Sequence, residues 1–220
     1  MNASAKRDIV AALLDRHGQT YSEELGIDLA QNTPSPLFRW LCASILFSAR
    51  ISANIAVKAA RALADQGWTT AQAMADTTWE QRVRVLNRSG YARYDESTSR
   101  MLGDTVDLLL RQYDGDLRTL REEAGRDPRE ERRRLKDCKG LGDVGVDIFF
   151  RETQCVWDEL YPFADKKALK AAGRLDLGNG AEDLARLVDR SDFPRLIAAL
   201  VRTDLEKDYE GVDQAATGEG

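Results

Sequence analysis

The sequence is poor in residues that bind metals or form disulfides. Its 220 residues include three cysteines and one histidine. Cys42, Cys138 and Cys155 lie too far apart for a paired metal-binding spacing, and their odd number does not suit a secreted disulfide framework. We therefore expect a cytoplasmic chain without a structural metal, in which His17 is a partly exposed residue of the first helix and not a zinc ligand.

Long apolar runs are also absent. Residues 1–30 contain no continuous apolar stretch, and the apolar segment 37–49 is interrupted by Arg39, Ser44 and Ser48, so we expect neither a signal peptide nor a membrane span. No run alternates β-branched or aromatic residues with polar ones, as a half-buried strand would. Because 43% of the residues are hydrophobic, the chain can bury the core of one or two domains.

The net charge of −5 has the wrong sign for a protein that gains its affinity from phosphate contacts. The basic residues are nevertheless clustered, at Arg129, Arg132, Arg133, Arg134, Lys136 and Lys139, and again at Lys166, Lys167, Lys170 and Arg174. A local basic face can coexist with an acidic remainder. A solvated helix face is the other interpretation of such runs.

Helical signals run along most of the chain. Thr20 with Glu23, and Thr77 with Glu80, have the spacing of capping boxes. Residues 36–49 are apolar nearly all round, which predicts a central core helix, and residues 101–113 repeat apolar side chains every three or four positions. The C-terminal DQAATGEG is expected to be frayed. We predict an all-α fold.

The most informative stretch is residues 135–177. A basic helix is predicted to end at Lys139, the turn Gly140-Leu141-Gly142 follows, and an apolar helix runs from about Val144 to Phe150. Glycines let the main chain touch a ligand, and the amides that start the next helix can hold a phosphate oxygen. A plain helix C-cap is the alternative. Further on, Asp165 directly precedes KKALKAAGRL, where by itself it predicts an ordinary N-cap.

Taken in order, these segments resemble one known superfamily. KGLGDVGVDIFFRE followed by PFADKKALKAAGRLDLG resembles the helix-hairpin-helix and aspartate-bearing signature of the endonuclease III superfamily of DNA glycosylases. Upstream, PLFRWLCASILFSARISANIAVKAARAL resembles its buried helix and RVLNRSGYARY its Gly-Tyr turn. The resemblance implies an endonuclease III-like fold of two helical domains. The hairpin, about 135–150, would lie in a bundle of residues 36–154, and the chain ends, 1–35 and 155–220, would form the other domain.

The same resemblance implies a site. Asp165 would be the catalytic carboxylate, which stabilises an oxocarbenium-like sugar and orients a water once a nucleotide has been flipped out of the duplex. Arg50 and Tyr91 would be pocket candidates. The residues expected at the DNA backbone are Lys139, Gly140, Leu141, Gly142, Gly145, Lys166 and Lys167. The partner would be double-stranded DNA, damaged or mismatched, and the family allows a monovalent cation at the hairpin.

Four departures from the family narrow the expected reaction. Val144 stands where bifunctional members carry the lysine that forms a Schiff base, so no lyase activity is expected. No cysteine follows Cys155, so the four-cysteine iron-sulfur cluster of some members is not expected. Asp143 places a carboxylate beside the hairpin, where it would repel a phosphate; a cap of the following helix is the alternative role. Ala43 replaces the catalytic glutamate of the adenine-specific members.

Three functions stay open from the sequence. A monofunctional DNA glycosylase is favoured by Asp165. A non-catalytic binder of damaged or distorted DNA on the same fold is favoured by Val144 and Asp143. A helical protein without a nucleic-acid role is favoured by the acidic net charge.

Overall fold

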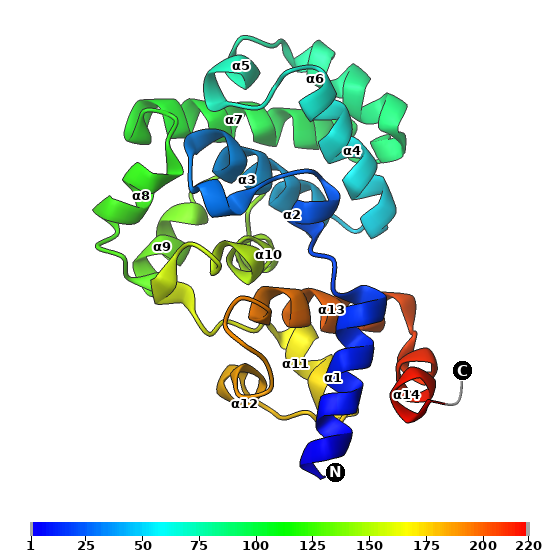
Figure 1. The fold of residues 1–220 in the computed structure, drawn as a ribbon. Helices are drawn as coiled ribbons and strands as arrows, with labels where there is room; N and C mark the ends of the chain where they lie inside the picture. The colour runs from blue at the N-terminus through cyan, green and yellow to red at the C-terminus, as the bar shows by residue number, and fades with distance from the viewer. Residues whose placement is uncertain (1, 219–220) are drawn as a thin grey trace. The chain divides into compact units, whose positions relative to one another are not determined.

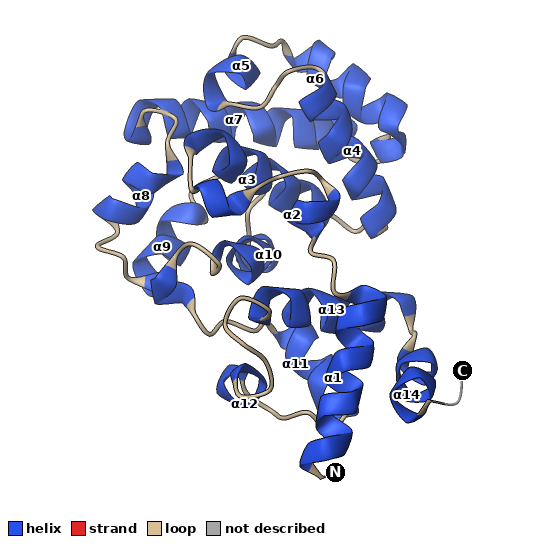
Figure 2. Cartoon of the chain, in the orientation of Figure 1, coloured by secondary structure: helices blue, strands red, loops and turns tan. Residues whose placement is uncertain are grey.

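The structure is a computed structural model that describes residues 2–218. Within those residues it consists of helices, turns and loops without a strand, which confirms the predicted all-α class (Figure 2). Leu25–Glu159 form one compact unit, the central unit, and the described parts of Met1–Glu24 and Leu160–Gly220 form the other, the terminal unit. Across the described chain, no helix is both long and apolar enough to cross a bilayer.

The central unit is one continuous stretch of chain, drawn from blue to yellow-green in Figure 1. Its helices are η1 (Leu29–Gln31), α3 (Pro34–Ser48), α4 (Ala53–Asp65), α5 (Ala71–Ala75), α6 (Trp79–Leu86), η2 (Asn87–Tyr91), α7 (Asp95–Tyr113), α8 (Leu117–Glu123), α9 (Pro128–Leu135) and α10 (Asp143–Thr153). The short η3 (Asp158–Leu160) spans the end of this unit in sequence.

The terminal unit combines the two ends of the chain. Its helices are α1 (Ala3–His17), α2 (Tyr21–Glu24), α11 (Lys166–Arg174), α12 (Ala181–Ala185), α13 (Phe193–Glu206) and α14 (Tyr209–Thr217). Because α14 is helical to Thr217, the expected fraying is wrong for residues 213–217, and Glu219 and Gly220 lie outside the described residues.

The core of the terminal unit lies around α13, which packs against both α1 and α11, while α1 also packs against α14. Leu13, Phe193 and Leu196 are fully buried in it. His17 ends α1 and is buried too, with Nε2 2.8 Å from Oδ2 of Asp208. The expected partial exposure of His17 is wrong because Asp208, at the start of α14, lies against its ring.

In the central unit α3 is the core helix, as its apolar run predicted. Leu37, Trp40 and Leu41 are fully buried, and the helix packs against α4, α7, α8 and α10. Trp40 donates a hydrogen bond from Nε1 to the carbonyl oxygen of Phe149 on α10, at 3.1 Å. This contact attaches α10 directly to the core helix of the unit.

The predicted bundle, residues 36–154, lies inside the central unit, which extends further at both ends. At its start, Arg39 on α3 donates to the carbonyl oxygens of Leu25 and Gly26, at 3.0 and 3.2 Å. At its end, Arg121 on α8 forms an ion pair with Glu159 in which both nitrogen-oxygen distances are 2.6 Å. These polar contacts attach the flanking segments to the bundle. The predicted bounds missed these segments because the periodicity of apolar residues does not reveal polar contacts.

One predicted capping box is confirmed and the other is displaced. At α2, the amide of Thr20 donates to Glu23 at 2.9 Å and the amide of Glu23 donates to the Thr20 hydroxyl at 3.2 Å. At α6 the box is formed by Thr78 and Gln81, one residue later than predicted. The shift arises because the Thr77 hydroxyl donates to a carbonyl oxygen at the end of α5, at 2.6 Å.

One carboxyl group of α9 is buried in the interior of the central unit, and its pKa is shifted. Glu131 is 0% exposed, and neither of its carboxyl oxygens has a hydrogen bond of acceptable geometry to any described residue. Burial in the first place, and the neighbouring Glu159 carboxylate in the second, raise the pKa of Glu131 to about 8. By contrast, hydrogen bonds from Arg133 and Arg134 lower the pKa of the adjacent Glu130 to about 2.

Replacing Glu131 by Gln is expected to flatten the pH dependence of stability. The folded chain keeps the Glu131 proton up to about pH 8, whereas the unfolded chain releases it near 4.5, so native stability falls as the pH rises from about 4.5 to about 8. Thermal unfolding at pH 6 and pH 9 should show a larger fall in Tm for the native chain than for Glu131→Gln, by roughly 3–10 °C. Glu130→Gln is the control, because that carboxyl is ionised at both pH values, and it should keep the native fall. Equal falls for the native chain and Glu131→Gln would contradict the burial argument.

Candidate nucleic-acid interface

The connection between α9 and α10 is a tight turn. α9 ends at Leu135, and turns occupy the residues up to Lys139, so the prediction that the helix runs to Lys139 is wrong. The last backbone hydrogen bonds after α9 join residues three apart, for example the Cys138 amide to the Leu135 carbonyl oxygen at 3.1 Å. This spacing is that of a 3₁₀ turn, which often ends an α-helix. The amide of Leu141 donates to the Cys138 carbonyl oxygen at 3.1 Å and closes the bend. We call residues 139–142 the glycine turn.

The glycine turn is closely packed on one side. Gly140 has a φ of +84°, and a Cβ there would lie 2.8 Å from Sδ of Met101 and 3.0 Å from Cγ2 of Ile45. Leu141 is buried, and a Cβ on Gly145 would lie 2.9 Å from its Cδ1. Leu141 and Gly145 were expected at the DNA backbone, but their buried positions make them supports of the turn.

Two hydroxyl groups hold the backbone of the turn. Ser48, the last residue of α3, donates from Oγ to the Gly140 carbonyl oxygen at 3.1 Å. Thr105 on α7 donates from Oγ1 to the Lys139 carbonyl oxygen at 3.1 Å. The sequence did not predict the role of Thr105. The sequence signal that could have found it is a threonine at an apolar position of the helical repeat. Thr105 is fully buried in the structure, and a buried hydroxyl needs a hydrogen-bond partner.

The first turn of α10 presents its amides without a side-chain cap. Its N-cap is Gly142, which makes no side-chain hydrogen bond and has open space where a Cβ would be. The N-caps of α5, α8, α9 and α11 are threonine or aspartate side chains that accept an amide hydrogen bond, whereas α3, α7, α12, α13 and α14 share with α10 the lack of such a cap. Uncapped amides and the positive end of the helix dipole can together bind an anionic oxygen. Gly142 is the turn residue best placed for this.

The charges around the turn are mostly paired. Lys136 lies 2.8 Å from Asp143, and Arg132 lies 2.6 Å from Asp147, measured between nitrogen and oxygen. Other pairs on α9 join Arg133 to Glu130, and Arg134 to Glu130 and Glu123. The basic run predicted as a face is therefore largely neutralised within the unit. Lys139 differs, because it is exposed and forms no ion pair with any described residue.

Asp165 lies in the terminal unit, at the N-cap of α11. Its Oδ1 accepts a hydrogen bond from the Ala168 amide at 2.8 Å. The residue is 7% exposed. Lys166 and Lys167 follow it in the first turn of α11, and both are exposed. The structure therefore supports the N-cap interpretation of Asp165, and a carboxylate that caps a helix in this way keeps its charge close to the helix N-terminus.

The two pocket candidates differ in accessibility. Arg50 is exposed just beyond the end of α3 and can contact a ligand. Tyr91 is 0% exposed and donates its hydroxyl to the carbonyl oxygen of Leu46 at 2.9 Å. Burial raises the pKa of Tyr91 to about 12. Tyr91 is therefore a core residue, and the prediction that it contacts a base is wrong in this structure.

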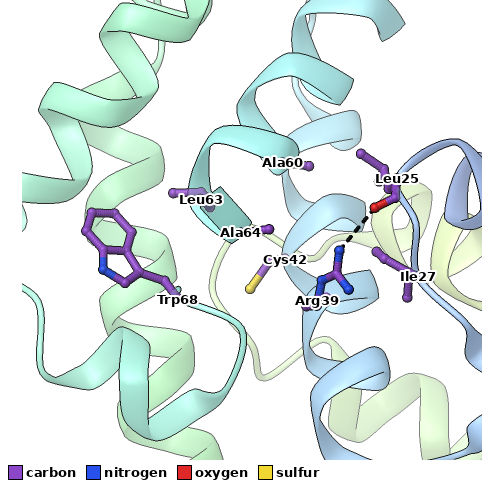
Figure 3. Close-up of a pocket in the computed structure, with 8 residues that line it drawn as sticks. All are labelled: Leu25, Ile27, Arg39, Cys42, Ala60, Leu63, Ala64 and Trp68. Carbon is purple, nitrogen blue, oxygen red and sulfur yellow. Dashed lines mark hydrogen bonds between the residues drawn. The ribbon is translucent and has the colours of Figure 1, made fainter. Parts of the chain in front are cut away.

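A pocket of the central unit is too small to hold a nucleobase. It lies between α3, α4 and neighbouring loops, and Figure 3 shows Arg39 directed at the Leu25 carbonyl oxygen, with Cys42 and Trp68 also on the lining. Its volume is about 20 Å³, room for about one water molecule. Burial raises the pKa of the Cys42 thiol far above its ordinary value, which leaves it a poor nucleophile.

The cysteines do not match the ligand set of an iron-sulfur cluster. Cys42 and Cys138 are buried and Cys155 is exposed, and three thiols cannot supply four thiolate ligands. Among residues 2–218, no group of three or more histidine, cysteine, aspartate or glutamate side chains lies together as a metal site requires.

Substitution by alanine is expected to lower the free energy of unfolding at one of the two turn glycines and to leave it nearly unchanged at the other. Gly140→Ala should destabilise the protein by about 1–3 kcal/mol, because it combines a positive φ with a close approach to Met101. Gly142→Ala should change the stability by less than about 0.5 kcal/mol, because its backbone is extended and its Cβ meets open space. Urea unfolding of both variants measures the difference. Equal stabilities would show that the turn tolerates another conformation.

Comparison with known proteins returned no relative for this chain. No protein-family model, no curated protein and no solved structure matches it.

Proposed function

We propose that this chain binds duplex DNA through the glycine turn, acting as a helix-hairpin-helix, and that it is a monofunctional DNA glycosylase of endonuclease III-like fold. The observation that carries the proposal is the uncapped first turn of α10. Its amides follow a backbone that is fixed from one side by Ser48 and Thr105. Such an end can hold a phosphate oxygen without reading a base.

The charges near the turn fit a contact with one phosphate. Lys139 contributes an unpaired cation, and Lys136 offsets the charge of Asp143 at 2.8 Å. Because this ion pair is close to neutral, the amides and the dipole of α10 would be the main attraction for the phosphate. Such a contact does not require a positive net charge of the whole chain. The monovalent cation expected at the hairpin stays a prediction.

In the proposed reaction Asp165 is the catalytic carboxylate. Cleavage of the bond between base and sugar leaves positive charge on the sugar ring, and a carboxylate close to that ring stabilises it and orients the attacking water. The substrate would be a damaged or mismatched base, because weak pairing lowers the free energy needed to flip the nucleotide. Val144 has no amine, so a Schiff base and strand cleavage by β-elimination do not belong to this mechanism.

A second function, DNA binding without catalysis, is favoured by the state of Asp165 itself. Its side chain is 7% exposed and already caps α11. A carboxylate whose role is to start a helix explains its presence without any reaction. The hairpin would then bind damaged or distorted DNA alone.

Removing the charge of Lys139 is expected to weaken DNA binding more than removing a paired charge nearby. Lys139→Gln should lower the affinity for a duplex about 3–10-fold and reduce the slope of log K against log salt by about one. Arg133→Gln is the matched control, since Arg133 is already paired with Glu130 at 2.6 Å, and it should change both quantities little. Fluorescence anisotropy across salt concentrations measures them. The same small effect for both variants would remove the hairpin from the interface.

Asp165→Asn separates catalysis from structure. Asparagine is as good an N-cap as aspartate, so the variant should keep its thermal stability and its DNA affinity. It should lose base release by at least a factor of about 100. Duplexes with uracil, alkylated purines, oxidised pyrimidines or mismatches, followed by alkali, provide the assay, and borohydride should trap no adduct. Binding without release by the native chain would leave the second function, and a trapped adduct would contradict the role given to Val144.

A further inference from the structure

A polar groove lies between α6 and α7 of the central unit, apart from the residues of the glycine turn. Its volume is about 440 Å³, within the size range of small-molecule sites. Its lining consists of Trp79, Arg82, Arg100, Gly103, Asp104 and Asp107. None of these residues was singled out by sequence reasoning.

Arg82 is the fixed element of the groove. It is 7% exposed, donating from Nε to the Ser99 carbonyl oxygen at 3.1 Å and from Nη1 to the carbonyl and hydroxyl oxygens of Thr77 at 2.9 and 2.8 Å. It forms no ion pair with any residue the structure describes, and Nη2 has no acceptor among them. Burial lowers the pKa of this guanidinium, and the nearby carboxylates of Asp107 and Asp104 offset that effect in part.

The unused donors of Arg82 lie where α7 has no side chain. A Cβ on Gly103 would be 2.8 Å from Nη2. The absence of that Cβ leaves the Nη2 group beside the open groove. An acceptor atom of a ligand that entered the groove could therefore reach a guanidinium that three hydrogen bonds already hold in place.

The groove also offers acceptors and a flat ring. Asp104 and Asp107 are three residues apart on α7 and so share a face; both are exposed, and neither forms an ion pair within residues 2–218. The Trp79 ring is half-buried and held by a hydrogen bond from Nε1 to the Glu96 carbonyl oxygen at 3.1 Å. Donors, carboxylates and an indole thus line one groove.

This combination of charges makes a simple ion a poor ligand for the groove. A phosphate or a plain carboxylate would meet the charges of Asp104 and Asp107, and an alkylammonium would meet Arg82. A planar ring with acceptors on one edge and donors on the other satisfies both. Guanine has such edges, because O6 and N7 accept from arginine, N1–H and the 2-amino group donate to a carboxylate, and its face stacks on an aromatic side chain.

We propose that the α6–α7 groove binds a guanine ring, with Arg82 at its O6/N7 edge, Asp104 or Asp107 at its N1/N2 edge and Trp79 against its face. The ring could belong to a free nucleoside or to an unpaired guanine of a DNA strand. The proposal does not depend on the hairpin or on Asp165.

Calorimetric titration with nucleosides tests the ring. Guanosine should bind with a dissociation constant below about 1 mM, while inosine, which lacks the 2-amino group, and 7-deazaguanosine, which lacks N7, should each bind about tenfold more weakly. Adenosine that binds as tightly as guanosine would overturn the proposal.

Variants locate the binding in the groove. The double variant Asp104→Asn with Asp107→Asn, and separately Gly103→Ala, should each weaken guanosine about tenfold or more. Asp114→Asn, at the end of α7 and outside the groove, is the control and should bind as the native chain does. If Arg82 only braces the two helices, guanosine will bind none of the proteins or all of them equally, and either result overturns the proposal.

A short single-stranded oligonucleotide with one guanine distinguishes the two sources. If it binds more tightly than guanosine, and the Asp104/Asp107 double variant removes the difference while Lys139→Gln does not, the ligand is a guanine in a strand. Equal affinities identify the free nucleoside. A loss caused by Lys139→Gln alone would place the contact at the hairpin and overturn the groove as a strand-binding site. Failure of guanosine binding would leave the hairpin proposal untouched.

Discussion

The geometry of the interface depends on two hydroxyl groups that hold a backbone segment from outside. Ser48 and Thr105 bind the carbonyl oxygens of Gly140 and Lys139, and they come from helices far from the turn in sequence. Because α3 is the core helix of the central unit, its last residue ties the turn, and with it the first amides of α10, to that core. A loop held only by its own residues would not present amides in a fixed direction.

The proposed contact with a phosphate is compatible with an acidic chain. In that proposal the attraction at α10 would come from oriented amides, which are independent of the number of charged side chains. The ion pair between Lys136 and Asp143 removes one negative charge from the immediate surroundings of the turn. The net charge of −5 then affects long-range approach and salt dependence more than it affects the contact itself.

The sequence predicted those features in which a residue type allows few conformations or environments. The apolar run of α3 had to be a core helix, and the glycines near residue 140 had to form a turn, because a Cβ at Gly140 does not fit. It failed for amphipathic residues. Tyr91 and His17 were judged by their own chemistry, but Leu46 and Asp208, distant in sequence, supply the partners that bury them.

Charged residues in the interior were missed for the same reason. Glu131 and Arg82 look like surface residues of basic or polar helices, and nothing in their neighbours in sequence marks them as buried. Their environment is set by α7, α8 and η3, which reach them only in the folded chain. A sequence pattern records which residues repeat along one helix and does not record what packs against it.

The division of the chain also constrains the order in which it can fold during synthesis. The central unit is contiguous, so it can form as soon as it has left the ribosome. α1 is made before the central unit, whereas α13, which packs against it, is made after that unit. While the central unit is being made, α1 therefore has an unburied hydrophobic surface, and it is a segment that chaperones would be expected to bind.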